Sequence, residues 1–520
     1  MTEIGKRQVP RNLLMNILSF GVNIGAGLWL VPYLIGHLGT AAYGLVPLAM
    51  VFTQFVSVIT QSFNVATGRS LTLCIQGKNQ GGATAVFNTS LLVALGFVTV
   101  QALVCVVILL NLGYAVQIPA GLYRDCLWLF GFTFAGFLFS LIGSVFSISM
   151  YSHNRVDLMR LNDIARMVGR IATIITLFLF FGPALIHVGI GNFVGGLVGL
   201  AMNAHVWKKL TPELKISLRT ADLGQLRPMA VMAGWILVNQ LGYLLFLRID
   251  TYVINRFIGP EACGEYAAVQ QWNQLARTTA GVLSGAIAPL GMIYYARGEI
   301  GKLVRMMQLA VKLMALAMAA PLALLCVFSG EILALWLGEG FRGLGALMIL
   351  QLSPLVVNLG VLPLFTINTA LNRVKFPAIL TFVLGGANLL LAILFATRTN
   401  WGFYGVAAAG VIVLTVKNLL FTPFYAAHIL ELPKFAFFRP LLGGATAFLT
   451  LSGLGVAVHG LLRFDSFPEI ALALCFICIG VGLPIAWLGL SSEERGLLAD
   501  FAPTFSRKFA RRALLVRTAK

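Results

Sequence analysis

The sequence predicts an all-α polytopic membrane protein with about 14 transmembrane helices. The composition is 59% hydrophobic and only 11% charged, with a mean hydropathy of +0.89. Soluble globular domains carry about a quarter charged residues, so this chain lies far outside that class. Apolar runs of about 20 residues, enough to cross a bilayer as a helix, recur along nearly the whole chain. Strand-sized alternating segments are absent, which argues against a transmembrane barrel.

The expected helices follow one another with short connections and form two similar groups of six. We expect residues 1–206 to form the first six-helix bundle and residues 228–430 the second, with 207–227 as a cytoplasmic linker. Residues 431–490 hold two extra helices, and residues 491–520 form a basic, amphipathic tail. The helices are expected to begin near Asn12, Ala42, Thr84, Arg124, Asp163, Ala184, Pro228, Ala262, Leu303, Leu344, Phe376, Gly402, Phe438 and Pro468.

The placement of Lys and Arg predicts the orientation of the helices. Cytoplasmic loops of membrane proteins are enriched in these residues. With the N-terminus inside, the opposite side receives few of the 37, namely Arg124, Arg256, Arg342, Arg398 and Arg463. Both termini are therefore expected in the cytoplasm, and the net charge of +19 is interpreted as an orientation signal, not as a site for nucleic acid. The tail either lies on the anionic leaflet as an amphipathic helix or is a frayed basic segment.

An internal repeat links the two groups of six helices. Around Gly39 the chain reads HLGTAAYGLVPLAMVFTQF, and around Gly259 it reads FIGPEACGEYAAVQQWNQL. At a constant offset of 220, four residues match their counterparts: Gly39, Gly44, Gln54 and Gly81 match Gly259, Gly264, Gln274 and Gly301. Six helices separate the copies, so both run in the same direction. Parallel repeats of this kind place a substrate between the two halves.

Polar residues within the helices mark the candidate substrate site. A guanidinium near the centre of a bilayer costs at least ~3 kcal/mol unless it faces water or a partner. Arg277 is such a residue, roughly 22 Å from a helix start near Ala262. Gln270 and Gln274 lie on the same helical face as Arg277, and Gln54, Ser57 and Gln61 share one face of the second helix. The alternative for these amides is hydrogen bonding between helices, which contributes about 0.6 to 2 kcal/mol per contact.

Basic residues at membrane depth outnumber acidic ones. Lys417 and Arg277 fall near the middle of their helices and are interpreted as cavity residues. Arg166 and Arg170 open the predicted fifth helix, so Arg170 is either a substrate contact or an ordinary interface anchor. A diphosphate suits such a site because Arg forks and Lys point charges both bind phosphate oxygens. We find no catalytic, metal or nucleotide motif, so neither an enzyme nor a cofactor is expected.

Two stretches carry a resemblance to a known family. Asn23, Pro32, Leu38-Gly39 and Tyr43-Gly44 form one pattern, and R-I-D-x-x-V-I-x-x-F-I-G at Arg248 to Gly259 forms the other. Together they resemble the oligosaccharide flippases of the multidrug/oligosaccharidyl-lipid/polysaccharide exporter superfamily. The best match is the polysaccharide-transporter branch, the Wzx-type flippases of O-antigen and exopolysaccharide units. The resemblance implies two six-helix bundles in a V shape around a central cavity.

The resemblance also implies a function and its partners. It implies turnover of undecaprenyl-diphosphate-linked oligosaccharide from the cytoplasmic to the periplasmic leaflet of the bacterial inner membrane. The expected partners are this lipid-linked oligosaccharide and membrane lipids. The resemblance is also compatible with contacts to glycan-assembly proteins. One alternative is a cation-coupled multidrug exporter, although the segment from Asn12 to Gly36 lacks the acid such exporters use. Another is a membrane glycan polymerase or ligase, although every predicted outer loop is short.

Overall fold

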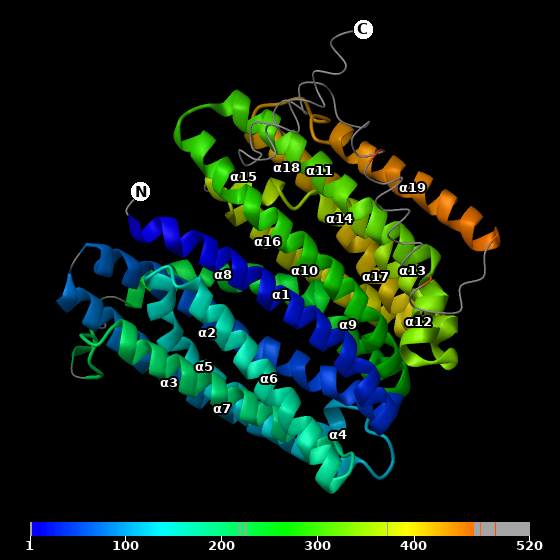
Figure 1. Cartoon of the computed structure of the whole chain (residues 1–520), viewed down its shortest axis with the longest axis horizontal. Coiled ribbons are helices and arrows are strands. Elements are labelled where there is room, and N and C mark those ends of the chain that lie inside the picture. Colours follow the sequence, from blue (N-terminus) through cyan, green and yellow to red (C-terminus); the bar gives the residue numbers. More distant parts are fainter. Residues whose placement is uncertain are drawn as a thin grey trace. The chain divides into compact units, whose positions relative to one another are not determined.

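The computed structural model describes residues 3–461, except 78, 218–219, 223, 225 and 372, together with residues 469 and 484. Helices make up the described chain, and none of its residues is in a strand (Figure 1). The first half contains α1 (Glu3–Leu38), α2 (Thr40–Gln76), α3 (Gln80–Leu110), the short α4 (Leu112–Ala115), α5 (Tyr123–Ser152), α6 (Val156–Phe181) and α7 (Leu185–Leu210).

The second half is more broken. It contains α8 (Leu226–Leu247), α9 (Ile249–Phe257), α10 (Pro260–Ala296), α11 (Ile300–Val327), α12 (Ser329–Leu337), the 3₁₀ turn η3 (Glu339–Leu344), α13 (Gly345–Leu352), α14 (Leu355–Gly360), α15 (Leu364–Ala370), α16 (Lys375–Arg398), α17 (Phe403–Val416), the π-helical turn η4 (Lys417–Phe421), α18 (Thr422–Ile429) and α19 (Phe438–Leu461).

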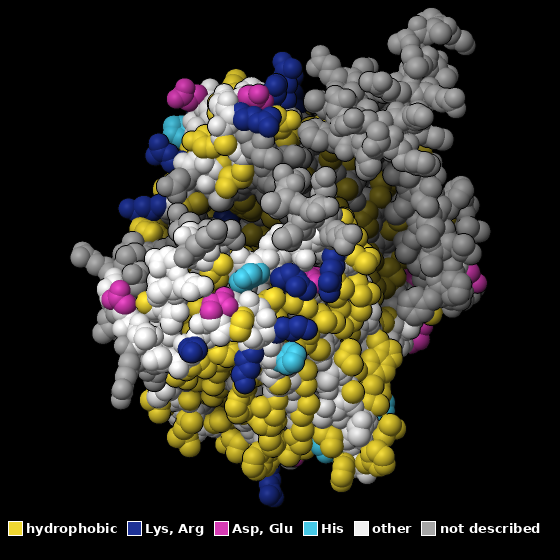
Figure 2. All heavy atoms as spheres, turned by 60° about the vertical axis from the view of Figure 1, so that its left-hand side comes forward, with side chains coloured by type: hydrophobic (Ala, Val, Ile, Leu, Met, Phe, Trp, Pro, Cys, Tyr) yellow, Lys and Arg dark blue, Asp and Glu magenta, His cyan; other side chains and the backbone are white. Residues whose placement is uncertain are grey.

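The helices have the length and composition of membrane spans. Eleven helical segments within the described residues are long and apolar enough to cross a bilayer. Their outward faces carry large apolar side chains, such as Leu110, Leu179 and Phe180, each more than 70% exposed. Figure 2 shows such side chains covering much of the lower part of one face. A surface of this kind needs lipid around it. The all-α polytopic membrane fold is therefore confirmed, and the count of 14 helices stays a prediction.

Two predicted features fall on residues outside the described part of the chain. The first of the two extra helices is α19, which starts at Phe438 as expected. The second, expected from Pro468, and the tail of residues 491–520 lie outside the described residues.

The predicted starts of two helices are wrong. The first helix, expected near Asn12, begins at Glu3, and the fifth also begins early. We expected it near Asp163, but α6 begins at Val156, two turns earlier. The first turns of α6 are charged, which made them resemble a loop in the sequence. These charges are paired: Arg155 and Arg11 contact Asp157 at 3.0 and 2.9 Å, and Arg160 contacts Asp163 at 3.1 Å. Pairing lets a helix continue beyond the apolar part of the membrane.

The internal repeat extends to the helix boundaries. α2 and α10 are both 37 residues long, and their starts, Thr40 and Pro260, are separated by the predicted offset of 220. The starts of α3 and α11, Gln80 and Ile300, are separated by the same number of residues. Gly39 and Gly259, which precede the two long helices, both have a positive φ, as glycine allows. Thus equivalent positions in the two halves begin equivalent helices.

The two repeats meet at their equivalent glycines. A methyl group at Gly44 would lie 2.7 Å from the Pro260 carbonyl oxygen, and one at Gly264 would overlap the Thr40 carbonyl oxygen. The Cys263 thiol also lies 3.5 Å from the Gly44 carbonyl oxygen. Residue 40 of one repeat therefore touches residue 264 of the other, and residue 44 touches residue 260. Such a reciprocal pairing is the signature of a two-fold contact. Only glycine lets the α2 and α10 backbones approach this closely.

The chain packs as two compact units. The first comprises residues 1–271 and 374–413, and the second comprises residues 272–373 and 414–520. α10 contributes to both units. In the first unit, α2, α3, α5 and α7 bury a cluster around Leu71, Phe87 and Trp207. In the second, α11, α15 and α18 bury a cluster around Met307, Leu364 and Phe437. The predicted domain boundaries, and the predicted V shape, stay predictions.

Candidate functional site

The polar residues of α2 lie along one face, as the sequence spacing predicted. Ser57 Oγ donates to the Gln54 carbonyl oxygen at 2.8 Å, and Gln61 Nε2 donates to Ser57 Oγ at 2.7 Å. Ser57 is buried, Gln54 is half-buried and Gln61 is exposed. These local bonds hold the row of side chains in place along α2.

Other polar residues of α2 bond to neighbouring helices instead. Asn64 donates to Ser144 of α5 at 2.7 Å, and Gln101 of α3 donates to Thr60 at 3.0 Å. These contacts are the interhelical hydrogen bonds that the alternative reading of the amides expected. They leave Gln54, Ser57 and Gln61 as the candidate substrate face of α2.

Arg170 lies further from the start of its helix than the sequence analysis placed it. Because α6 starts at Val156, Arg170 is 14 residues into the helix, about 21 Å along it. Because the charged first turns of α6 extend beyond the apolar part of the membrane, the interpretation of Arg166 and Arg170 as interface anchors stays a prediction. Arg166 bonds to Ser140 of α5 at 3.2 Å, whereas the buried Nε of Arg170 has no hydrogen-bond partner among the described residues. Arg170 is thus the better candidate for a ligand contact.

Arg277 is oriented by neutral groups. Its Nε donates to Asn273 Oδ1, one turn earlier on α10, at 2.6 Å. Asn273 is buried and donates in turn to the Gln351 carbonyl oxygen of α13 at 3.2 Å. The side-chain amide of Gln351 is buried and makes no hydrogen bond among the described residues. A line of polar groups therefore runs from α13 through Asn273 to the guanidinium in the second unit.

The amides near Arg277 on α10 are accessible. Gln270 and Gln274 are half-buried. Gln274 Nε2 lies 3.4 Å from Thr278 Oγ1, a long contact at the exposed side of the helix. The spacing of Gln270, Gln274 and Arg277 along this uninterrupted helix places them on one face. The sequence analysis predicted that these three residues share one face, and α10 contains all three without a break in the helix.

Lys417 is the most deeply buried of the three candidate cations. It is 8% exposed, and its Nζ lies 5.5 Å from the centre of the Phe365 ring, a cation–π distance. Lys417 opens the π-helical turn η4. Pro423 follows six residues later, and a proline disturbs the carbonyl group four residues earlier, which here lies within η4. Turns of this kind are frequent at functional sites. Pro423 within an apolar run was the sequence signal for this turn.

Two functional features of the site were missed from the sequence. The Asn273–Gln351 contact joins residues 78 apart, which no local pattern reveals. A second network surrounds Asp250, whose carboxylate accepts a hydrogen bond from Tyr266 at 3.0 Å and lies 3.5 Å from Asn388 Nδ2. Asp250 is thus bonded within the first unit by α10 and α16. It is one of the few acids buried in the described chain. These contacts connect it to two neighbouring helices of the first unit.

Comparison with known proteins places this geometry in a family. The model of a family described as polysaccharide biosynthesis protein matches residues 9–292. The chain belongs to this family. It is also 27% identical over 494 residues to a protein of Bacillus subtilis (strain 168) described as the uncharacterized membrane protein EpsK. That alignment covers 94% of this chain and 96% of the relative, so the similarity extends over nearly the whole of both chains.

Solved structures of similar fold come from transporters. The lipid II flippase MurJ, in an inward closed conformation, gives a TM-score of 0.64 at 15% identity and covers 94% of this chain and all of that one. A multidrug resistance MATE family transporter of the MOP superfamily, facing inward, gives a TM-score of 0.62 at 15% identity, covering 82% and 95%. At this identity the likeness establishes the fold alone. The polysaccharide biosynthesis protein thus has the fold of MurJ and of the MATE transporters.

Proposed function

We propose that this protein is a flippase that moves a lipid-linked oligosaccharide from the cytoplasmic to the periplasmic leaflet by alternating access. The lipid carrier we propose is undecaprenyl diphosphate, bearing an O-antigen or exopolysaccharide unit. The membrane is the bacterial inner membrane, with both termini in the cytoplasm. The observation that carries the proposal is the set of cations at membrane depth, Arg170, Arg277 and Lys417, in a chain of a polysaccharide biosynthesis family.

The chemistry of these cations suits a diphosphate. Burying a cation in a membrane protein is costly, so its presence calls for a function or a partner. Arg277 is held by the neutral Asn273, and Lys417 faces the Phe365 ring, so neither of these contacts neutralises the charge. Diphosphate oxygens offer the acceptors that an Arg fork and a Lys ammonium group bind. The acid Asp250 accepts a hydrogen bond from Tyr266 within the first unit.

The amides suit the sugar part of the substrate. Gln54 and Gln61 on α2, and Gln270 and Gln274 on α10, offer both donors and acceptors to hydroxyl groups. Gln61 and Gln274 donate to the hydroxyl groups of Ser57 and Thr278, which a sugar hydroxyl replaces without a large cost. We propose that many such weak contacts bind the oligosaccharide, while the cations bind its diphosphate.

Reconstitution tests this proposal. Purified protein in sealed liposomes should move a short-chain lipid diphosphate oligosaccharide to the outer leaflet, where an added glycan-modifying enzyme reaches it. Lys417→Ala should slow this movement at least about tenfold, since a charged contact to the phosphate is lost. The exposed and ion-paired Lys302→Ala is a matched control and should leave the rate unchanged. Equal rates for the unsubstituted protein, Lys417→Ala and Lys302→Ala would overturn the proposal.

A second candidate is a cation-coupled multidrug exporter. The observation that favours it is the fold shared with the MATE transporters. A cationic drug, however, needs buried carboxylates, and the α1 segment from Asn12 to Gly36 has none. Drug-driven proton or sodium flux through the same liposomes, without any movement of the lipid diphosphate, would favour this candidate.

A further inference from the structure

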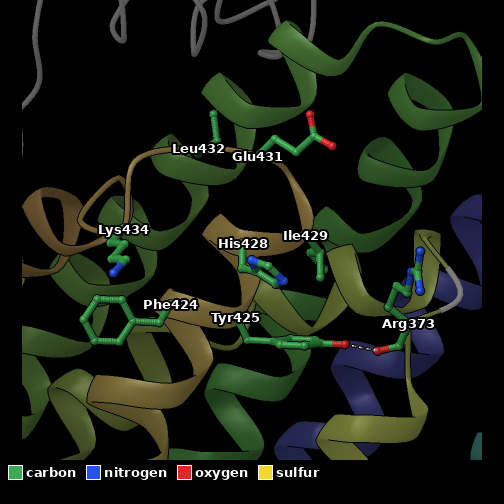
Figure 3. A pocket seen from close by; sticks show the side chains of 8 residues that line it. All are labelled: Arg373, Phe424, Tyr425, His428, Ile429, Glu431, Leu432 and Lys434. Atoms are coloured by element: carbon green, nitrogen blue, oxygen red, sulfur yellow. Dashed lines mark hydrogen bonds between the residues drawn. The ribbon is translucent and has the colours of Figure 1, made fainter.

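A pocket of about 870 Å³ lies in the second unit, and its lining contains none of the residues proposed to bind the transported substrate. α18 and the segment after it form one wall, and the connection after α15 forms the other. Its lining residues are Arg373, Phe424, Tyr425, His428, Ile429, Glu431, Leu432 and Lys434 (Figure 3). All of them belong to one unit, so the pocket is complete within it.

The rim of the pocket is cationic. Arg373 and Lys434 stand at its two ends, with His428 between them (Figure 3). All three side chains are exposed. Among the described residues none of the three lies within ion-pair distance of a carboxylate, although Glu431 also lines the pocket. Two full positive charges therefore face one negative charge, and the pocket favours an anion.

The floor of the pocket is aromatic and fixed. Tyr425 stacks on Phe421 with ring centres 5.2 Å apart, and its hydroxyl donates to the Arg373 carbonyl oxygen at 3.3 Å. This bond ties the connection that carries Arg373 to α18. Beside it, Phe424 packs against Phe438 at 5.0 Å and Phe435 at 5.7 Å. An aromatic base under a charged rim matches the boundary between acyl chains and headgroups.

The backbone of the pocket is strained at one residue. Glu431 has φ of 56°, a conformation that costs a residue with a side chain about 1 kcal/mol or more. The turn is closed by the Leu432 amide, which donates to the Ala427 carbonyl oxygen at 2.9 Å. Glycine would form this turn at less cost. The carboxylate at this position instead adds a negative charge to the cationic rim, which suits a ligand that has hydroxyl groups beside its anion.

We propose that this pocket binds the phosphate group of an anionic lipid in the cytoplasmic leaflet. Arg373 and Lys434 contact the phosphate oxygens, and Glu431 accepts a hydrogen bond from a neighbouring hydroxyl group. The acyl chains lie along the exposed Phe435 side of the aromatic floor. Arg373 and Lys434 fall on the cytoplasmic side in the orientation predicted from Lys and Arg placement. Basic pockets on that side of membrane proteins bind lipid headgroups. This proposal does not depend on the transported substrate.

Native mass spectrometry of the full chain in detergent tests the proposal. Phosphatidylglycerol should bind in preference to phosphatidylcholine. Arg373→Ala and Lys434→Ala should each weaken the binding of phosphatidylglycerol about fivefold, because each surface cation contributes at about that level. Glu431→Gln should strengthen it, since it removes the negative charge and alters no fold contact that the described residues make. Lys302→Ala, which removes an exposed cation outside the pocket, should have no effect.

Competition identifies the source of the phosphate. Undecaprenyl diphosphate that displaces phosphatidylglycerol supports a site for lipid phosphates in general. No displacement by it supports a site restricted to phospholipids. Displacement by the same concentration of inorganic phosphate would overturn the assignment to a lipid. Equal binding of the two phospholipids, or equal losses in the Lys302 and Arg373 variants, would overturn the site itself.

Discussion

The Arg277 guanidinium donates a hydrogen bond to Asn273, an uncharged group, and this contact orients the charge without cancelling it. Asn273 is fixed by α13 through the Gln351 carbonyl oxygen. A guanidinium so oriented is prepared to bind an anion, because less side-chain entropy is lost when the ligand arrives. Glu265, the acid nearest to it along α10, is 12 residues away, about 18 Å along the helix.

Substitution of Arg277 separates a substrate role from a structural one. Arg277→Ala should remain well expressed, because it removes a charge that is costly in a membrane, but it should lose glycan export. Arg277→Lys should keep part of the activity, since Lys supplies the charge without the planar fork. Arg277→Glu should abolish export by repelling the anion. Complementation of a strain lacking its flippase, with protein levels measured in parallel, provides the readout. A well-expressed Arg277→Ala protein with wild-type export contradicts the cavity assignment.

At the residue scale, the sequence predicted the identity of candidate residues better than their surroundings. The shared face of Gln54, Ser57 and Gln61 follows from helical spacing alone, and their hydrogen bonds confirm it. The distance of Arg170 from its helix start could not be predicted, because the charged first turns of α6 resemble a loop until their ion pairs are seen. The roles assigned to these residues stay predictions.

At the scale of helices, the contact between α2 and α10 depends on the absence of two side chains. Gly44 and Gly264 place the two backbones at a distance that no other residue permits. The sequence predicted the repeat that contains these glycines, because their offset of 220 is visible in it. It could not predict that equivalent positions touch, since a repeat in sequence does not specify which faces of the copies pack together.

Alanine substitutions on α10 test this contact. Gly264→Ala should lower the thermal midpoint of the purified protein, because its methyl group overlaps the Thr40 carbonyl oxygen and overpacking costs about 1 to 3 kcal/mol. Gly281→Ala on the same helix is the matched control. A methyl group at Gly281 meets no atom within 4 Å, so the change should be neutral or slightly stabilising. Equal thermal midpoints for the two variants would show that α2 and α10 do not meet at Gly264.

At the scale of the whole molecule, the membrane potential would bias the proposed diphosphate substrate outward. A diphosphate with a charge of about −2 gains roughly 2.3 kcal/mol per charge per 100 mV when it leaves an inside-negative compartment. We therefore expect flipping in sealed vesicles to follow an imposed potential. Rates that ignore the potential but follow a proton or sodium gradient would instead require a coupling ion.

The predicted orientation has its own test. A reporter that is active only in the cytoplasm should be active when fused after Lys209 at the end of α7 or at Lys520. The same reporter should be inactive when fused near Arg398 at the end of α16, which the distribution of Lys and Arg places outside. Activity at Arg398 would reverse the assignment of α16 and α17, and with it the cytoplasmic placement of the lipid pocket.

The reciprocal contact of Thr40 and Gly44 with Gly264 and Pro260 has an evolutionary consequence. Two copies of a half-length chain could form such a contact, but every substitution would then appear twice. When both copies lie in one chain, a substitution in one copy leaves the sequence of the other unchanged. At the offset of 220, Arg277 corresponds to Ser57, Lys417 to Leu197 and Arg170 to Leu390. A pair of identical chains would carry every one of these cations twice, at twice the cost in a membrane. A single chain that carries both repeats can therefore hold an asymmetric set of charges beside a symmetric contact.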